Sequence, residues 1–162
     1  MADQRGVSII IPVFNEAENL GQLLDRLRSV LLPSWEVIVV DDGSTDGSSE
    51  IAEKRGARVI RHPYNIGNGA AIKNGIRAAR GRLLVFMDGD GQHQPEDIPK
   101  LLSGMNRYHM VVGAREGIEL AVSSLRGQYD LQCLCFLRYW FQSAGSHLRF
   151  SRPFAQRCPE IH

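Results

Sequence analysis

The sequence is short of cysteine, of net charge and of long apolar runs. Its 162 residues contain three cysteines, Cys133, Cys135 and Cys158, which form neither a disulfide framework nor a zinc-ligand spacing. The net charge is +1, so there is no overall basic field to attract nucleic acid. These shortages argue against a disulfide-stabilised secreted module and against a nucleic-acid-binding protein.

No uncharged apolar run approaches the roughly 20 residues that a membrane-spanning helix needs. The start, MADQRGVSIII, also lacks the basic region and long apolar stretch of a signal peptide. We therefore expect a cytoplasmic protein that consists of one domain, or part of one, and is long enough to bury a hydrophobic core.

Apolar, β-branched runs alternate with amphipathic segments along the chain. The runs predict strands at residues 7–13, 36–40, 58–61, 83–87 and 110–113. The amphipathic segments predict a helix that Asn15 caps and that ends near Pro33, and further helices at 48–55, 70–79 and 95–105. This alternation is typical of a parallel sheet with right-handed crossovers.

Polar segments with glycine follow three of these strands, after Val13, Val40 and Met87. In open α/β sheets, ligands bind beyond the carboxyl ends of the strands, so the three segments can share one site. The third segment is the most informative, because Asp88 and Asp90 flank a glycine directly after a buried strand. Two such carboxylates can hold a divalent cation whose further partner is a phosphate.

Other side chains near Asp90 admit plainer interpretations. Gln92 supplies another hard oxygen of the kind that magnesium or manganese accepts. His93 could be a ligand, but a loop histidine is more often structural or exposed. Lys73 and Arg77, on the helix expected at 70–79, fit a solvated face, although a phosphate contact by Lys73 stays open.

The segment after Val40 contains a pattern that resembles a calcium-binding loop, with acidic or hydroxyl residues from Asp42 to Glu53. A calcium loop of that type follows a helix, whereas here a strand precedes it, so a capped strand-to-helix turn explains the pattern better. Asp41 and Asp42 still need polar or cationic partners, because adjacent acids at a strand end repel each other. Gly67-Asn68-Gly69 lacks the third glycine of a dinucleotide fingerprint and predicts a tight turn.

Five segments together resemble a known family. VSIIIPVFNEAENL, VIVVDDGSTDGS, NIGNGAAIKNGIRAARG, LLVFMDGDGQHQPEDIPKLL and VVGAR are similar, in order and spacing, to segments of the family-two glycosyltransferases. Within that family they resemble the dolichyl-phosphate mannose synthase and polyprenyl-phosphate glycosyltransferase branch. The resemblance covers residues 7–115 and implies a GT-A-type α/β fold, a Rossmann-like, mostly parallel sheet flanked by helices, with residues 1–115 as the nucleotide-sugar-binding domain.

The resemblance also assigns roles to matching positions. The first nucleotide-contacting segment matches Pro12, Phe14 and Glu16; the family often has tyrosine where Phe14 stands, so stacking remains and a hydroxyl contact is lost. The second segment matches Val40 and Asp42, whose acid contacts the nucleoside.

The remaining matches concern the diphosphate and the metal. Asp88, Gly89 and Asp90 match the metal and diphosphate motif, with Asp90 as the catalytic residue and Gln92 as a further metal ligand. Arg115 matches a basic residue expected near the diphosphate.

The function that the resemblance implies is metal-assisted, inverting transfer of a hexose, mannose or glucose, from a GDP- or UDP-sugar to a polyprenyl or dolichyl phosphate. The cofactor would be Mg²⁺ or Mn²⁺, and contact with the cytoplasmic membrane face would be peripheral. A lipid phosphate is already anionic, whereas a hydroxyl acceptor needs a general base, and none is evident after Arg115. Two alternatives stay open: a transferase to a glycan hydroxyl, and a truncated, non-catalytic nucleotide-sugar-binding domain.

After Glu116 the resemblance stops, and residues 116–162 form an atypical tail that we do not expect to be an independent domain. Residues 127–162 contain no lysine and all three cysteines. One interpretation is a family-specific appendix with an aromatic helix at 131–141 that touches a membrane or a partner.

The second interpretation of the tail is a shifted reading frame. Permitted codons for residues 127–152, read with the first nucleotide dropped, give ANTIYNAFASYVTGFKVPDLTSGFR, which resembles the family's next segment. The fold would then be incomplete at its C-terminus and would lack the acceptor half of the site. Sequencing the gene tests this hypothesis: an uninterrupted frame whose codons do not give that string would refute it.

Overall fold

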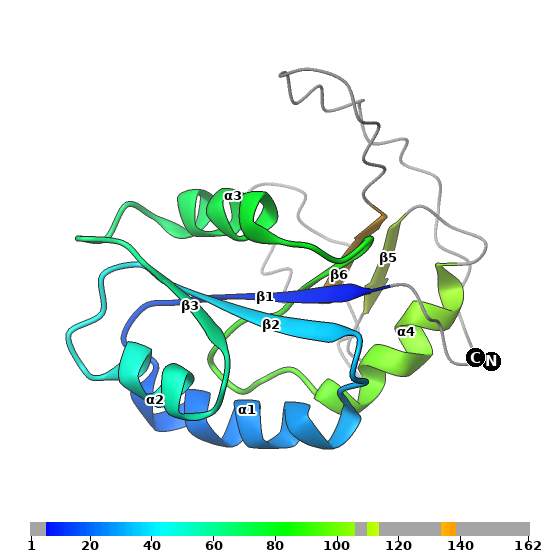
Figure 1. The fold of residues 1–162 in the computed structure, drawn as a ribbon, viewed down its shortest axis with the longest axis horizontal. Coiled ribbons are helices and arrows are strands. Elements are labelled where there is room, and N and C mark those ends of the chain that lie inside the picture. Colours follow the sequence, from blue (N-terminus) through cyan, green and yellow to red (C-terminus); the bar gives the residue numbers. More distant parts are fainter. Residues whose placement is uncertain (1–5, 106–109, 114–133, 139–162) are drawn as a thin grey trace, which may run out of the picture.

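The computed structural model describes residues 6–105, 110–113 and 134–138, which form a six-stranded sheet with helices on both faces (Figure 1). The strand order is β3-β2-β1-β4-β6-β5. The strands are β1 (Val7–Val13), β2 (Trp35–Asp41), β3 (Arg58–Arg61), β4 (Leu83–Phe86), β5 (Met110–Gly113) and β6 (Leu134–Arg138).

The sheet is mostly parallel. β1 pairs in parallel with β2 and β4, and β2 pairs in parallel with β3, whereas β6 is antiparallel to both β4 and β5. The predicted α/β class with a mostly parallel sheet is therefore confirmed.

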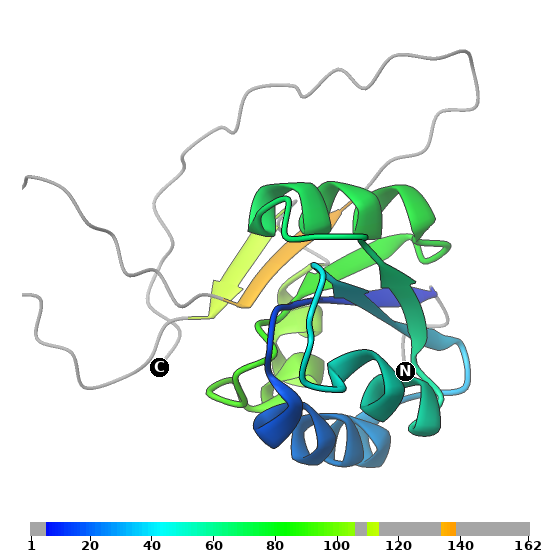
Figure 2. The ribbon, with the colours of Figure 1, turned by 90° about the vertical axis from the view of Figure 1, so that its left-hand side faces the viewer.

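The helices form two unequal layers. Figure 1 shows α3 (Asn68–Ala78) on one face of the sheet and α1 (Ala17–Val30), α2 (Ser48–Lys54) and α4 (Ile98–Gly104) on the other. A short 3-10 turn, η1 (Pro95–Asp97), leads into α4. The view turned by 90° shows the same two layers (Figure 2). In the described part of the chain, no helix is both long enough and apolar enough to cross a membrane.

Each face of the sheet has its own core, because successive side chains of a strand point to opposite faces. Ile9 and Ile11 of β1 belong to the larger core, which α1 completes with Leu20, Leu23, Leu24 and Leu27. Ile10 belongs to the smaller core beneath α3. All of these side chains are at most 3% exposed, and each large one contributes about 1.5–3 kcal/mol by its burial.

Gly75 allows α3 to lie unusually close to the sheet. A Cβ atom at this position would come within 2.4 Å of Ile10 Cγ2 and 3.2 Å of Val40 Cγ2. Any larger residue would therefore push α3 away from β1 and β2. The close approach brings the polar residues of α3 beside the carboxyl end of β2.

The structure corrects two local predictions. Asn15 does not cap α1: it adopts a left-handed conformation with φ of 56°, and its side chain accepts the Thr45 N–H at 2.9 Å. The aromatic helix expected at 131–141 is wrong in its centre, because Leu134–Arg138 is a strand that pairs with β4 and β5. Part of the atypical tail thus joins the main sheet. A strand at this position satisfies backbone groups of β4 and β5 that would lack a partner if residues 134–138 were helical.

Candidate functional site

The carboxyl ends of β1, β2 and β4 lie side by side, because β1 pairs in parallel with both neighbours. The Asp42 N–H donates to the Val13 carbonyl oxygen at 2.8 Å, so β1 and β2 stay joined beyond their last strand residues. The polar segments that follow the three strands therefore meet at one edge of the sheet, as the sequence predicted.

Gly89 brings the end of β4 close to the end of β1. A Cβ atom there would lie 3.0 Å from Val13 Cγ2, 3.5 Å from the Pro12 carbonyl oxygen and 3.7 Å from Glu16 Cγ. A larger residue at this position would therefore crowd the end of β1. Three residues that the sequence predicted in one site, Pro12, Glu16 and Gly89, are neighbours in the structure.

Asp88 and Asp90 are half-buried beside this contact. One oxygen of Asp90 accepts the Gln92 N–H at 2.9 Å, which closes a local turn. Among the described residues, the Asp88 carboxylate has no hydrogen bond, and neither acid forms an ion pair with a lysine or arginine. Two like charges thus stand two residues apart with most of their oxygen lone pairs available.

These oxygens suit a hard divalent cation. Mg²⁺ and Mn²⁺ bind oxygen ligands and are commonly held by one or two carboxylates together with substrate phosphates. No group of three or more histidine, cysteine, aspartate or glutamate residues that could hold a metal occurs within the described ranges. The donor set at the end of β4 therefore fits a cation that also takes ligands from a phosphorylated substrate.

His93 supports this loop from inside. Its side chain is 5% exposed, and its Nδ1 accepts the Asp88 N–H at 3.3 Å. The interpretation of His93 as a structural residue agrees with this placement.

The acids at the end of β2 are placed differently. Asp41 is fully buried; its carboxylate accepts the Ser44 N–H at 2.7 Å and the Ser49 hydroxyl, and Arg61 Nε lies 3.8 Å away. The expected strand-to-helix turn is confirmed, but the N-cap residue of α2 is Gly47, without a side-chain cap hydrogen bond, and Asp46 Oδ1 accepts the Ser48 N–H at 3.0 Å. The calcium-loop alternative is excluded because β2 is a strand.

Asp42 is 3% exposed and holds the loop between β3 and α3. Its Oδ1 accepts from His62 Nδ1 at 2.7 Å and from the Ile66 N–H at 2.9 Å, and its Oδ2 accepts the Gly67 N–H at 2.7 Å. Burial raises the pKa of Asp42, but these hydrogen bonds, of which the one from His62 is the largest, outweigh it, so the net pKa lies below its ordinary value. Asp42 is therefore an ionised acceptor at neutral pH.

The remaining predicted contact residues differ in exposure. Phe14 is 45% exposed, so its ring is accessible next to the end of β1. Val40 is fully buried in the core beneath α3. Lys73 and Arg77 are exposed, as a solvated face of α3 predicts. Arg115 lies outside the described residues.

The sequence did not predict His62 and Asn74 as site residues. His62 is 5% exposed, and its Nε2 lies 2.8 Å from Asn74 Nδ2. The sequence carries a signal for Asn74 alone: it directly precedes the small Gly75, which is buried against the sheet, but nothing in the sequence shows that Asn74 meets His62.

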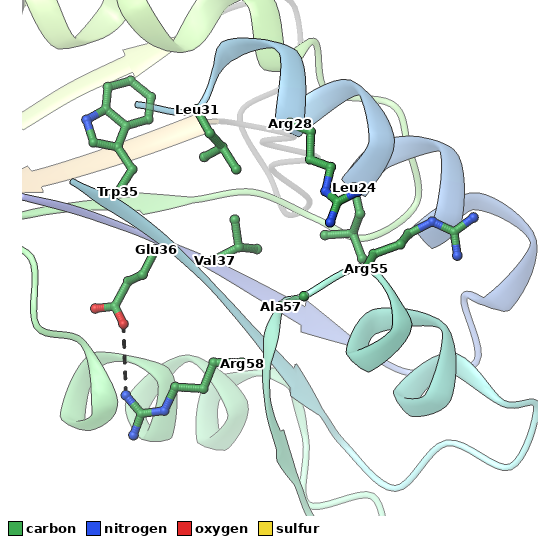
Figure 3. A pocket seen from close by; sticks show the side chains of 10 residues that line it. Leu24, Arg28, Leu31, Trp35, Glu36, Val37, Arg55, Ala57 and Arg58 are labelled. Carbon is green, nitrogen blue, oxygen red and sulfur yellow. Dashed lines mark ion pairs between the residues drawn. The ribbon is translucent and has the colours of Figure 1, made fainter. Parts of the chain in front are cut away.

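A hollow lies at this edge of the sheet, and a pocket lies at the opposite edge. A hollow of about 480 Å³ beside the ends of β2 and β3 is lined by Gly43, Ser44, Thr45, Arg61, His62 and Pro63. A smaller pocket of about 290 Å³ lies at the opposite, amino ends of β2 and β3, between α1 and the start of β3 (Figure 3). Two of its arginines are paired: Arg58 with Glu36, which also lines the pocket and lies 3.9 Å away, and Arg55 with Asp25.

Comparison with known proteins identifies relatives of this arrangement. The family model described as "Glycosyl transferase family 2" matches residues 8–157. Dodecaprenyl-phosphate galacturonate synthase of Rhizobium johnstonii is 38% identical over 121 residues, covering 68% of this chain and 36% of that protein. Dolichol-phosphate mannosyltransferase of Pyrococcus furiosus is 39% identical over 115 residues, covering 67% of this chain and 33% of that protein.

Solved structures agree with the fold. A mannosyltransferase from Pyrobaculum calidifontis in complex with GDP-Man and Mn²⁺ superposes with a TM-score of 0.61 at 21% identity, over 68% of this chain and 35% of that one. Glucosyl-3-phosphoglycerate synthase from Mycobacterium tuberculosis, in complex with Mn²⁺, UDP and glucosyl-3-phosphoglycerate, gives a TM-score of 0.56 at 29% identity, over 63% and 40%. The chain spans about a third to a half of the length of the curated relatives it matches.

Proposed function

The chain belongs to glycosyltransferase family 2 and has its GT-A fold, and from this membership we propose that it transfers a hexose from a nucleoside diphosphate sugar to a polyprenyl phosphate. The observation that carries the proposal is the pair Asp88 and Asp90, half-buried without a cationic partner among the described residues and joined to the end of β1 through Gly89. The reaction would take place at the cytoplasmic membrane face, where a soluble donor can meet a lipid acceptor.

Asp88 and Asp90 would hold Mg²⁺ or Mn²⁺, with Gln92 as a further oxygen ligand. When bound, the cation stabilises the negative charge that develops on the departing nucleoside diphosphate. The protein contributes two carboxylates on a loop whose conformation is fixed before the cation binds. Gly89 seats this loop against β1, and His93 holds its backbone at the Asp88 N–H.

The nucleoside end of the donor would lie at Phe14 and Asp42. The Phe14 ring, 45% exposed, offers a surface for stacking. A carboxylate has about four lone-pair sites, and Asp42 uses three of them internally, which leaves one for a donor on the base. Uracil and guanine both carry a ring N–H that can donate to this site. Asp42 is therefore compatible with UDP- and GDP-sugars and does not separate them.

The polyprenyl phosphate acceptor is supported by the relatives, whose names include dodecaprenyl-phosphate galacturonate synthase and dolichol-phosphate mannosyltransferase. A phosphate oxygen is anionic at neutral pH, so the enzyme would not have to supply a general base for it. Inversion at the sugar carbon follows from a single direct displacement by that oxygen.

A hydroxyl acceptor is the second candidate. The observation in its favour is the likeness to glucosyl-3-phosphoglycerate synthase from Mycobacterium tuberculosis, at 29% identity. The protein would then have to place a carboxylate near the acceptor hydroxyl as general base.

The third candidate function is that of a non-catalytic nucleotide-sugar-binding domain.

Two measurements test these proposals in order. Calorimetry of the whole chain with UDP and GDP, with and without Mn²⁺ or Mg²⁺, is expected to show nucleotide binding that requires the metal. Labelled UDP- and GDP-hexoses are then offered with polyprenyl phosphate, with 3-phosphoglycerate, or with water alone. Label transferred to the lipid phosphate supports the first function, label on 3-phosphoglycerate supports the second, and tight binding without any transfer supports the third. Absence of metal-dependent nucleotide binding would refute all three.

A further inference from the structure

His62 is a buried histidine whose two ring nitrogens are both engaged, and the proposed transfer reaction gives it no role. Its Nδ1 lies 2.7 Å from Asp42 Oδ1, and its Nε2 lies 2.8 Å from Asn74 Nδ2. The side chain is 5% exposed, so water does not compete for either contact. A buried polar ring that is held at both ends has one preferred orientation.

The contacts of Asn74 determine which ring nitrogen carries the proton. Asn74 Oδ1 accepts from Arg77 Nη1 at 3.2 Å, so its Nδ2 is the atom turned toward the histidine. An amide NH₂ only donates, and His62 Nε2 must therefore accept. In the neutral ring the proton then resides on Nδ1 and is donated to Asp42. The donors run in one direction, from Arg77 through Asn74 and His62 to Asp42.

The backbone fixes both ends of this chain of hydrogen bonds. The His62 N–H donates to the Asp41 carbonyl oxygen at 2.8 Å, which ties the histidine to the end of β2. Asn74 is carried by α3 at its closest approach to the sheet, because the neighbouring Gly75 packs against Ile10 and Val40. The ring therefore cannot follow Asp42 if the carboxylate moves, and it holds the carboxylate in place.

Asp42 in turn holds the loop at residues 63–67 through the Ile66 and Gly67 N–H groups. This loop carries Tyr64 and Ile66, which are 67% and 50% exposed, next to the site edge. An Asp42 carboxylate that rotated away would release both N–H groups, and protonation of the carboxylate would weaken both hydrogen bonds. The position of the loop thus depends on the histidine.

We propose that His62 and Asn74 are positioning residues that keep Asp42 ionised and directed at the nucleoside, and that keep the loop at 63–67 closed beside it. The proposal rests on the proposed function for the identity of the ligand, but the hydrogen-bond direction is a property of the chain alone. The nearest other charged groups are Asp41 on β2, Arg61 on β3, which pairs with Asp41 and Glu50, and Arg77 on α3.

Affinity for nucleotide in the presence of Mn²⁺ tests the proposal with three variants of the full chain. His62→Leu removes the donor to Asp42 and should weaken UDP or GDP binding about 10-fold or more. His62→Asn can still donate from a position near that of Nδ1, and should recover binding to within about threefold of the parent. Arg80→Ala, exposed just beyond α3, is the matched control and should bind like the parent.

The pH profile separates positioning from mere folding. Burial raises the pKa of Asp42, and the hydrogen bond from His62 is the largest of the contributions that lower it. Without that bond the pKa rises, so nucleotide binding by His62→Leu should fail at a higher pH on the acid side than binding by the parent. His62→Asn should restore the parent's acid limit. Equal acid limits for the parent and His62→Leu would overturn the proposal.

Nitrogen-15 NMR of the histidine ring tests the direction of the hydrogen bonds without any ligand. At neutral pH the expected result is an unprotonated Nε2 and a protonated Nδ1, and Asn74→Ala should allow the other tautomer. A protonated Nε2 in the parent would overturn the proposed direction of the hydrogen bonds from Asn74 through His62 to Asp42, even if His62→Leu does not fold. If the parent binds no nucleotide but shows the expected tautomer, the proposed function fails and the positioning role of His62 stands.

Discussion

Two pairs of acids stand at the carboxyl ends of β2 and β4, the two strands that flank β1, and their surroundings are opposite in kind. Asp41 and Asp42, after β2, are 0% and 3% exposed and accept hydrogen bonds from backbone N–H groups, a hydroxyl and a histidine. Asp88 and Asp90, after β4, are half-buried, and the one hydrogen bond to their carboxylates among the described residues comes from the Gln92 N–H.

The difference shows that acids at strand ends have two kinds of role. A carboxylate that is buried and saturated with donors holds the backbone in place, and its loss leaves those donors unpaired. A carboxylate with vacant lone pairs and no cation nearby raises electrostatic repulsion, which a bound cation would relieve, and this is the arrangement that the proposed function uses. Asp42 belongs to the first kind but keeps one lone pair, so the proposal can give it a ligand as well.

The largest expected effect is on metal-dependent binding. Asp90→Asn removes one of the two charges at the end of β4 and should weaken Mn²⁺-dependent UDP or GDP binding at least about 100-fold, since a lost ligand charge leaves the cation poorly held. Calorimetry with and without Mn²⁺ measures the loss. Metal-dependent binding that persists in this variant would contradict the assignment of Asp90.

The next effect is on stability and sharpens the contrast. Asp41→Ala leaves the Ser44 N–H and the Ser49 hydroxyl without their acceptor in a buried site, and should lower the free energy of unfolding by about 2–4 kcal/mol. Asp88→Ala is the matched variant and should change it by no more than about 0.5 kcal/mol. Urea denaturation measures both. If both variants lose the same free energy of unfolding, the two pairs of acids do not differ in their structural role.

The β2 end should also make stability depend on pH. Burial raises the pKa values of Asp42 and Asp46, but the hydrogen bonds to their carboxylates lower these values by more. Both pKa values therefore lie below the ordinary value of 3.8 in the folded chain. The stabilisation is therefore complete well above pH 3.8 and is lost as the pH falls through the lower, folded-state pKa values.

Urea denaturation between pH 7 and pH 3 measures this dependence, and Asp46→Asn should flatten part of it. Glu96 provides a control: its hydrogen bond with Arg26 lowers its pKa, but the pair is exposed, so Glu96→Gln should change the profile little. If Asp46→Asn loses as much stability between pH 7 and pH 3 as the parent does, the carboxylates at the end of β2 are not the cause of the pH dependence.

The smallest effect concerns helix starts. The Asp46 carboxylate accepts the Ala17 N–H at 2.9 Å and the Ser48 N–H at 3.0 Å, so it serves the first turns of both α1 and α2. Asp46→Ala should cost about 1 kcal/mol in thermal or urea unfolding, as the loss of a helix cap usually does. Asn15→Ala, whose side chain holds the Thr45 N–H instead, should cost no more. A larger loss of stability in the Asn15 variant would show that the hydrogen bond from Thr45 to Asn15 stabilises the chain more than the two contacts of Asp46 do.

Local patterns in the sequence were sufficient for most of the fold. Strand and helix periodicity predicted β1 and β3 to the residue and α1 to within a turn, because burial on one face depends on spacing along the chain. The meeting of the three strand ends followed from parallel pairing. The paired acids after β4 were recognised because acids directly after an apolar run need a partner, although their metal remains part of the proposal.

The missed features depend on contacts between distant segments. His62 and Asn74 meet because α3 crosses back over β2, and no spacing rule for a loop histidine and a helical asparagine predicts it. Asn15 has the composition of a cap, but the turn at residues 44–48 supplies better-placed acceptors. β6 was missed because its apolar and aromatic run is compatible with a helix as well as a strand, and only pairing with β4 and β5 distinguishes the two.

The first turn of α1 has consequences for how the chain folds. The N–H groups of Asn15, Glu16 and Ala17 donate to Ser44, Ser48 and Asp46, which lie 29 to 32 positions later in the sequence. This helix cannot complete its start until β2 and the turn after it have formed. Residues 7–50 should thus behave as one cooperative unit in hydrogen exchange, with the amides of Asn15, Glu16 and Ala17 opening together with β2 rather than fraying alone.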